Sequence, residues 1–411
     1  MSTTILQHLT LIDGTGAEPK ENARVVIENG RIREVLEGTG EGLPSSAERI
    51  DCRGQFLLPG LIDAHVHLGA VEPTIVEQQR RCFPSYMLLK SLKIIRETLE
   101  QGFTTVRDCG GADAGLRQAL AEGLIPGPRL FICGRILSQT GGHGDFRLAS
   151  EFHAPREADA GVATGIYDGV DEVRRAAREQ LRRGADFLKV MAGGGVASPA
   201  DEITHSQYSP EELRAVAFEA ESAGKYVAAH CYADRSIVLC AEAGIRTIEH
   251  GNLMTEVGAE AMRRAGCYLV PTMVTYEAMA REGKKYGLPD FTARKNVLAL
   301  ERAEQSLREA LRFGVKIGSG SDLLGPMQGF KGEELALQAR VLGPMGAIVA
   351  ATRTNAEILG WEREIGTVEA GKRADLIVVN ADPLKDIRVF QNYRETITLI
   401  MQEGRVYKNI L

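Results

Sequence analysis

The sequence has little of several features that mark whole classes of protein. Only 6% of its 411 residues are aromatic, and there is a single Trp. Basic residues are not in excess, since 49 Lys and Arg against 55 Asp and Glu give a net charge of −6. No basic stripe, internal repeat or low-complexity tract stands out. We therefore expect neither nucleic acid nor an anionic membrane as a partner.

Cysteines and long apolar runs are also scarce. The seven cysteines are odd in number and show no CxxC spacing, which favours a reducing compartment over a disulfide framework. No run reaches the roughly 18 apolar residues of a membrane span. The first twenty residues lack the basic start and apolar stretch of a signal peptide. These observations predict a soluble, cytoplasmic protein.

Glycine, in contrast, is abundant. The 45 glycines are about 11% of the chain, against roughly 7% in an average protein. The hydrophobic share of 44% and the charged share of 25% are those of an ordinary globular protein. The glycine excess indicates many tight turns or close approaches of the backbone.

Both ends of the chain have the pattern of β-strands. Residues 4–12 precede the turn sequence Asp13-Gly14-Thr15-Gly16, and residues 24–28 precede Asn29-Gly30. Three further strand-like runs lie near the C-terminus, at 374–382, 397–404 and 405–409. The pattern predicts a small sheet domain built from residues 1–59 and 360–411.

The middle of the chain, residues 60–359, alternates short apolar runs with amphipathic helices. One helix has a capping signal, with Ser209 before Pro210, Glu212 three residues on and Gly224 at its end. Eight runs that are followed by helices predict an α/β fold, a (β/α)₈ TIM barrel, with a doubly wound sheet as the competing architecture. The eight runs are 61–68, 103–109, 129–134, 187–193, 226–231, 247–251, 268–272 and 315–322.

Polar residues of one chemical kind fall near the ends of these runs. Parallel barrel strands bring their carboxyl ends to one face, so residues far apart in sequence meet there. Residues two apart on a strand share a side, so the two histidines of the first run can face one ion. Imidazole nitrogen and carboxylate oxygen suit Zn²⁺ and similar metals. The predicted metal site comprises His65, His67, Lys189, His230, His250 and Asp322.

Lys189 lies inside the apolar run FLKVM. A charge buried there would cost several kcal/mol, and desolvation favours the neutral amine. A neutral amine can react with CO₂ to give a carbamate, which is an anionic bidentate ligand. A lysine paired with a neighbouring carboxylate is the structural alternative.

The whole chain resembles the amidohydrolase superfamily. The resemblance rests on the segment from Pro59 to His67, PGLIDAHVH, on the four later metal-site positions, and on LIDGTG and GTVEAGKRADLIVV at the two ends. Within the superfamily the chain is most similar to the imidazolonepropionase-related branch and its binuclear dipeptidases and prolidases. FLKVMAGGGVASPAD, THSQYSPEEL and SQTGGHGDFR support this. The resemblance implies that the two chain ends form a β-sandwich.

The resemblance also implies a site with two divalent metal ions, expected to be Zn. His65 and His67 with Asp322 would hold one ion, and His230 with His250 the other. A carbamate on Lys189 would bridge them together with a hydroxide. The bridging hydroxide would attack the amide carbon, and Asp322 would carry its proton to the leaving nitrogen.

Substrate contacts follow less directly. By resemblance, His143 and Tyr232 are expected to be catalytic groups that bind the substrate carbonyl or α-carboxylate. Arg147 and Tyr208 are loop candidates for the same task. The triplet Gly193-Gly194-Gly195 is interpreted as clearance beside Lys189.

The resulting hypothesis is a metallo-dipeptidase whose small-molecule substrate is a dipeptide or N-acyl amino acid, with Xaa-Pro dipeptides preferred. Three alternatives stay open. They are a carboxypeptidase or aryl-amide hydrolase of the same branch, a mononuclear deaminase or imidazolone-type cyclic amide hydrolase, and a non-catalytic scaffold. Lys189 distinguishes the binuclear metallo-dipeptidase from the mononuclear alternative. Gly- and Leu-rich outer helices leave room for the homo-oligomer that we expect.

Overall fold

Strands from both ends of the chain form one eight-stranded sheet. The computed structural model describes residues 3–38, 46–153 and 161–411. The strand order is β18-β17-β16-β5-β1-β2-β3, with β4 paired to β1. The strands are β1 (Thr3–Leu11), β2 (Lys20–Glu28), β3 (Arg31–Glu37), β4 (Glu48–Asp51), β5 (Phe56–Pro59), β16 (Leu376–Val379), β17 (Ile397–Gln402) and β18 (Arg405–Asn409).

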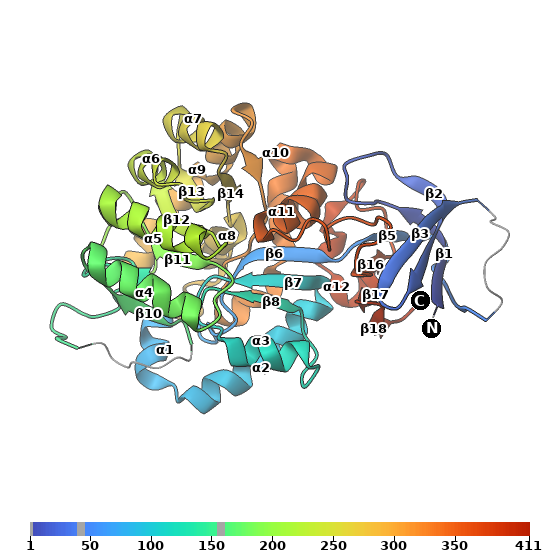
Figure 1. Ribbon diagram of the computed structural model, residues 1–411, viewed down its shortest axis with the longest axis horizontal. Helices are drawn as coiled ribbons and strands as arrows, with labels where there is room; N and C mark the ends of the chain where they lie inside the picture. Colours follow the sequence, from blue (N-terminus) through green and yellow to red (C-terminus); the bar gives the residue numbers. More distant parts are fainter. Residues whose placement is uncertain (1–2, 39–45, 154–160) are drawn as a thin grey trace.

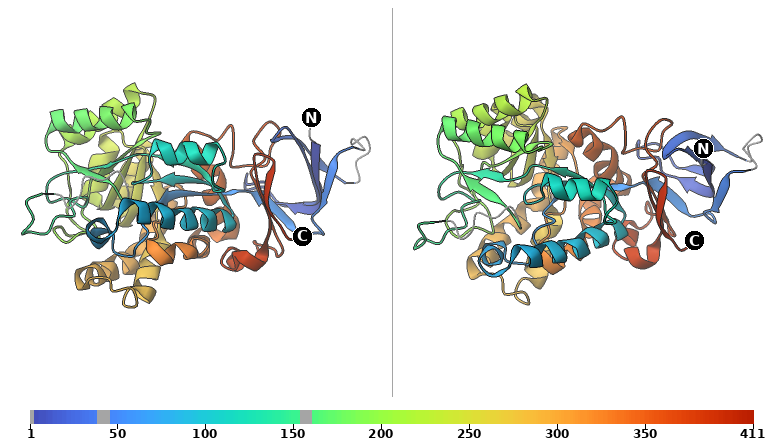
Figure 2. Two further views of the ribbon diagram at one scale, coloured as in Figure 1. Left: turned by 90° about the horizontal axis from the view of Figure 1, so that it is seen from below. Right: turned by 60° about the horizontal axis from the view of Figure 1, so that its bottom comes forward.

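The contact between the two chain ends is a strand pair. β5 is antiparallel to β16, with Leu376 opposite Pro59 and Val379 opposite Phe56. Figures 1 and 2 show these first and last strands together at one end of the molecule. Strands of both chain ends thus share one sheet, whereas the domain bounds at 1–59 and 360–411 and the two-layered sandwich stay predictions.

The strands of the middle region are all paired in parallel. Each of the eight predicted runs contains a strand, and β9 and β10 are additional. The first sheet is β6 (Leu61–Val66), β7 (Phe103–Asp108) and β8 (Arg129–Ile132). The second, in the order β10-β9-β11-β12-β13-β14-β15, is β9 (Ile136–Ser138), β10 (Thr164–Ile166), β11 (Leu188–Met191), β12 (Val227–Ala233), β13 (Thr247–Leu253), β14 (Tyr268–Val270) and β15 (Lys316–Ile317).

Isolated backbone hydrogen bonds join these two parallel sheets at the two places where their edges meet, which we call seams. Ala64 donates its backbone N–H to Ser319 O at 2.9 Å, and Asp322 donates to His65 O at 2.8 Å. At the other seam Asp186 donates to Ile132 O at 2.7 Å. No continuous ladder closes the ring among the described residues. The closed barrel therefore stays a prediction, while the parallel α/β architecture is confirmed.

Helices follow most of the parallel strands and cover the sheets (Figure 1). The capping box predicted for α5 is present, since Ser209 Oγ accepts from Glu212 N and Glu212 accepts from Ser209 N. The helices are α1 (Ile75–Arg81), α2 (Pro84–Glu100), α3 (Ala114–Ala121), α4 (Val170–Arg182), α5 (Pro210–Ser222), α6 (Asp234–Glu242), α7 (Glu256–Ala265), α8 (Met273–Glu282), α9 (Asp290–Arg312), α10 (Glu333–Val349), α11 (Asn355–Leu359) and α12 (Tyr393–Thr396), with short helical turns at Gly325–Phe330, Ala350–Thr354 and Ile387–Phe390.

One helical run, Glu333–Leu359, has the length and apolar composition of a membrane span, with a mean hydropathy of 1.3. The run is not one straight helix, because Gly343 is non-helical (φ 72°, ψ 164°) and Pro344 follows it. Ala347, Ile348 and Ala351 are buried in an apolar cluster that also includes residues of β6 and β16. In this structure the run is a kinked core segment.

Candidate metal centre

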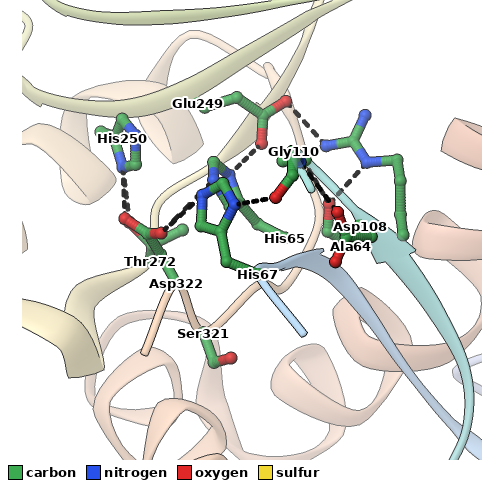
Figure 3. Close-up of polar contacts among 12 residues, drawn as sticks. Ala64, His65, His67, Asp108, Gly110, Glu249, His250, Thr272, Ser321 and Asp322 are labelled. Atoms are coloured by element: carbon green, nitrogen blue, oxygen red, sulfur yellow. Dashed lines mark hydrogen bonds and ion pairs between the residues drawn. The ribbon is translucent and has the colours of Figure 1, made fainter. Parts of the chain in front are cut away.

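Three histidines surround one carboxylate at the carboxyl ends of the parallel strands (Figure 3). His65 Nε2 lies 3.5 Å and His67 Nε2 lies 3.3 Å from Asp322 Oδ1. His250 Nδ1 lies 4.0 Å from Asp322 Oδ2. One ligand atom each from His65, His250 and Asp322 fall within 4.8 Å of one another. Imidazole and carboxylate at this spacing can share a divalent metal ion.

Further aromatic rings extend this cluster. The ring of His230, from β12, lies 4.5 Å from that of His250, centroid to centroid. His143 stacks on His230 at 4.2 Å, and Tyr232 stacks on His250 at 5.3 Å. Five predicted site residues, namely His65, His67, His230, His250 and Asp322, thus meet at one place in the structure, with His143 and Tyr232 at its edge.

Lys189 is buried in β11 with 1% of its surface exposed. Among the described residues its Nζ has no hydrogen-bond partner. The structural alternative, a lysine satisfied by a neighbouring carboxylate, is therefore not what the structure contains. An orphaned buried nitrogen beside a set of metal-competent groups fits a modified, ligating lysine.

Protein acceptors determine which ring nitrogen carries the proton in three of the histidines. A carbonyl or carboxylate oxygen can only accept, so the nitrogen facing it must donate, and the other nitrogen keeps a free lone pair. This arrangement is typical of metal-binding histidines. The three contacts are His65 Nδ1 to Glu249 Oε2 at 2.7 Å, His67 Nδ1 to Gly110 O at 3.0 Å, and His230 Nε2 to Gly194 O at 3.1 Å.

Burial keeps most of these imidazoles neutral at pH 7. Desolvation lowers the pKa of His250 to about 3 and that of His143 to about 4. It also holds the pKa values of His65 and His230 well below the ordinary value. A neutral imidazole is the form that binds a metal.

His67 and Asp322 shift each other in opposite directions. Burial acts to lower the pKa of His67, but the hydrogen bond and charge of Asp322 outweigh it and raise that pKa. Burial acts to raise the pKa of Asp322, but the charges of His65 and His67 outweigh it and hold that pKa well below the usual range. Asp322 is consequently an ionised carboxylate and a suitable ligand.

A fully buried ion pair supports His65 from behind. Arg107 Nη2 donates to Glu249 Oε1 at 2.7 Å, and both side chains are 0% exposed. Arg107 also donates to Ala64 O at 2.5 Å and to Thr247 Oγ1 at 3.1 Å. Burial acts to raise the pKa of Glu249, but the charge of Arg107 and its hydrogen bonds outweigh it and lower that pKa. Glu249 is therefore a charged acceptor that orients the His65 ring.

Neither Arg107 nor Glu249 was singled out from the sequence. Glu249 precedes His250 on one strand, and strand alternation would place it on the opposite side. His250 instead has a left-handed φ of 76°, so both side chains reach His65. Asp322 (φ 50°) and Thr272 (φ 48°), which contacts His250 Nδ1 at 2.7 Å, are left-handed as well. Such strained conformations cluster at functional sites.

A second buried group joins the strands that carry the ligands. Asp63 Oδ1 accepts from His65 N at 3.1 Å and from Ser321 N at 3.0 Å. Its Oδ2 accepts from Ser321 Oγ at 2.6 Å, and Lys331 Nζ lies 3.5 Å away. Asp63 thus connects β6 to the segment that presents Asp322. The sequence predicts Asp322 at the end of the eighth strand, whereas in the structure it lies beyond the end of β15.

The four predicted substrate contacts divide into two pairs. His143 and Tyr232 adjoin the cluster, and the Tyr232 hydroxyl lies 2.8 Å from that of Tyr276, a residue that sequence reasoning missed. Arg147 is held by Asp145 through bonds of 2.8 and 2.6 Å. Tyr208 is buried, with φ 59° and a hydroxyl that has no partner among the described residues. Within the described ranges no hydrogen bond or ion pair joins Arg147 or Tyr208 to the cluster, and their role stays a prediction.

The glycine triplet was misread from the sequence. A Cβ on Gly195 would lie 2.0 Å from Cε1 of His143, and one on Gly194 would meet Glu202 O at 2.0 Å. The nearest atoms to Gly193 belong to Cys231. The clearance that these glycines provide is therefore mainly for His143 and for a turn of the chain, and not for Lys189.

Comparison with known proteins agrees with this geometry. A model of the amidohydrolase family matches residues 56–406. This chain belongs to the amidohydrolase family. As a member of this family, the chain is a hydrolytic enzyme. Amidohydrolases are generally metal-dependent, which agrees with the histidine and aspartate cluster.

Individual amidohydrolases resemble the chain over almost its whole length. A prolidase complexed with N-methylphosphonate-L-proline has a TM-score of 0.95 and 40% identity, covering 99% of this chain and 100% of that one. A Xaa-Pro dipeptidase with bound methionine has a TM-score of 0.90, 29% identity, and coverage of 99% and 100%. Ochratoxinase of Aspergillus niger is 32% identical over 98% of this chain and 86% of its own. The prolidase-like assignment made from the sequence is confirmed.

The negative charge of Glu249 pairs with Arg107 and also keeps the proton on His65 Nδ1. Replacing Glu249 with Gln removes this charge. We expect Glu249→Gln to lower the affinity for a divalent metal about 10–100-fold, as measured by competition with a chromophoric chelator. Glu219→Gln is the matched control, because Glu219 pairs with Arg178 on α4. An unchanged affinity in Glu249→Gln would contradict the supporting role.

Proposed function

We propose that this amidohydrolase is a binuclear metal-dependent dipeptidase that cleaves the amide bond of dipeptides or N-acyl amino acids, with Xaa-Pro dipeptides as the preferred substrates. The observation that carries the proposal is Lys189 Nζ, buried and without a partner in the described part of the chain. A mononuclear site would need no lysine at this position. We also propose that residues 60–359 form a closed barrel and that residues 1–59 with 360–411 form a separate β-sandwich domain.

The donor set fits two ions, which we propose to be Zn²⁺. His65, His67 and Asp322 would hold one ion, since both Nε2 atoms face Asp322 Oδ1. His230 and His250 would hold the other, and their rings are in contact. For His230 the bond from Nε2 to Gly194 O leaves Nδ1 as the ligand atom. When bound, the two ions supply a hydroxide nucleophile at neutral pH and polarise the substrate carbonyl.

Lys189 would complete the set as a carbamate. Its neutral amine adds to CO₂, which forms an N–C bond and releases one proton. The product is an anion with two oxygen ligands. The burial of Nζ and its lack of a partner among the described residues support this step.

The chain's own residues then have defined tasks. Asp322, an ionised carboxylate in contact with His65 and His67, accepts a proton at an Oδ atom and returns it to the leaving nitrogen. His143 and Tyr232 flank the cluster and contact the substrate. Tyr276 fixes the Tyr232 hydroxyl through the 2.8 Å bond. Burial raises the pKa of Tyr232, so this phenol remains a hydrogen-bond donor.

A second candidate comes from the relatives. Ochratoxinase, at 32% identity, is about as similar to this chain as the Xaa-Pro dipeptidase with bound methionine, at 29%, and its name gives ochratoxin as the substrate. An aryl-amide hydrolase or a carboxypeptidase on the same metal site is therefore the alternative substrate class.

A substrate panel tests the dipeptidase proposal. Zn²⁺-loaded protein should hydrolyse Xaa-Pro dipeptides with a kcat/KM about 10-fold or more above that for Xaa-Ala, because a site shaped for the proline ring gains apolar contact with it. Hydrolysis is followed by release of the C-terminal amino acid, with metal-free protein as the control. Faster cleavage of aryl amides than of any dipeptide would favour the second candidate.

Lys189→Ala tests the carbamate. The variant should lose turnover, and short carboxylic acids with bicarbonate should partly restore it by replacing the bridging anion. The metal content measured after mild dialysis should be two ions per chain in the wild type and lower in the variant. Lys93→Ala, at an exposed position of α2, is the control. Full activity of Lys189→Ala, or a single tightly held ion in the wild type that bicarbonate does not affect, would sink the binuclear proposal.

Asp322→Asn tests the proton transfer. The amide keeps one oxygen ligand but is a poor base, so we expect some metal to be retained while kcat falls by about 10²–10⁴. Steady-state kinetics with metal content measured on the same sample separates the two effects. Asp386→Asn, on the surface, should behave as the wild type. An unchanged kcat in Asp322→Asn would remove Asp322 from the proton path.

A further inference from the structure

A buried polar cluster lies on the far side of His143 from the metal ligands. It contains a lysine from α9 and three residues of the chain after β11, and all of its members are at least nine-tenths buried. The cluster consists of Ser198, Asp201, Gln207 and Lys295, with His143 at one end. Neither the proposed metal site nor the proton path uses these four residues.

Lys295 anchors the cluster. Its Nζ donates to Ser198 O at 2.8 Å, to Gly195 O at 3.1 Å and to the carbonyl of Asp201, and it lies 3.4 Å from Asp201 Oδ1. Burying this ion pair carries a large desolvation penalty, which complete hydrogen bonding offsets. One side chain from α9 therefore determines the shape of the segment from Gly195 to Asp201.

Asp201 holds His143 by two routes. Gln207 donates from Nε2 to Asp201 Oδ2 at 2.8 Å, and its Oε1 accepts from His143 N at 2.9 Å. Ser198 Oγ contacts Asp201 Oδ1 on one side and His143 Nδ1, at 2.8 Å, on the other. The first route holds the backbone of His143 and the second holds its ring.

The proton positions along the ring route follow from the inventory of donors. Besides His143, Ser198 Oγ contacts only Asp201 Oδ1 and, at 3.3 Å, Gly195 O, in the part of the chain that the structure describes. Both are acceptors, so the single hydroxyl proton goes to one of them. Ser198 Oγ must then accept from His143, and His143 Nδ1 must carry the proton.

We propose that Ser198, Asp201 and Lys295 are positioning residues that hold His143 in its Nδ1–H form and so present an unprotonated Nε2 to the substrate. This inference rests on the proposed function for its substrate, but not for its geometry. The ring lies between Gly195 and His230, and these close contacts on both faces hinder its rotation. Nε2 then accepts a hydrogen bond from a substrate N–H or ammonium, in place of the contact with the substrate carbonyl or α-carboxylate that is expected from the sequence.

The tautomer can be tested without any substrate. In protein labelled with ¹⁵N-histidine, the signal that His143→Ala removes is that of His143. It should show a protonated Nδ1 and a bare Nε2, and in Ser198→Ala it should become a mixture of the two forms. Ser206→Ala is the matched control, because Ser206 Oγ is buried in the same region and has no hydrogen-bond partner in the described ranges. An Nε2–H form in the wild type would overturn the proposal.

Kinetics on Xaa-Pro dipeptides tests the positioning role. Ser198→Ala and Gly195→Ala should each lower kcat/KM about 10–100-fold with metal content unchanged. In a His143→Ala background the same substitutions should cost less than about twofold, because both act through the missing ring. Gly195→Ala serves if Ser198→Ala fails to fold. Losses that add independently of His143 would refute the role. Absence of any dipeptidase activity in the wild type would count against the proposed function alone, since the tautomer is measured separately.

Discussion

The Nζ of Lys189 lies in the interior beside His65 and His250 without a partner of its own among the described residues, and the surroundings explain why it stays so. The buried carboxylate of Glu249 does not pair with it, because its oxygens already accept from Arg107, Thr247 and His65. An ammonium group in this position would be an uncompensated charge. The proposed carbamate would remove that cost and would turn the same side chain into an anionic ligand.

Much of this centre could be predicted from the sequence, because the alternation of side chains along a strand indicates which residues share a side. Alternation along a strand placed His65 and His67 on one side and Cys231 on the side away from His230, where it is buried. The same rule failed for Glu249, because the left-handed backbone at His250 turns two consecutive side chains toward His65. Asp322 lies beside His65 and His67 as expected, but its strand ends earlier than its apolar pattern suggests. Backbone conformations of this kind have no signal in composition or spacing.

The groups that support the ligands were less accessible to sequence reasoning. Lys295 contacts Gly195 O from a hundred positions along the chain, and the sequence around it is that of an ordinary amphipathic helix. The importance of Tyr276 and Arg107 is likewise apparent only from their contacts, with Tyr232 and Glu249, in the folded chain. Gly195 belongs to a triplet of glycines that is conspicuous in the sequence, yet only the position of the His143 ring explains why no side chain is present there. Long-range contacts of this type are a property of the fold and not of any local pattern.

The strand pair between β5 and β16 has a consequence for how the protein is made. β5 ends at Pro59, and the partner that covers its open edge begins at Leu376. At about 5–20 residues per second, translation reaches that partner roughly 15–65 s later. During this interval the N-terminal strands present an unpaired edge while the parallel strands between them are synthesised. Completion of the eight-stranded sheet must therefore be a late event in biogenesis, and a nascent chain stalled before β16 would expose an edge open to association with other chains.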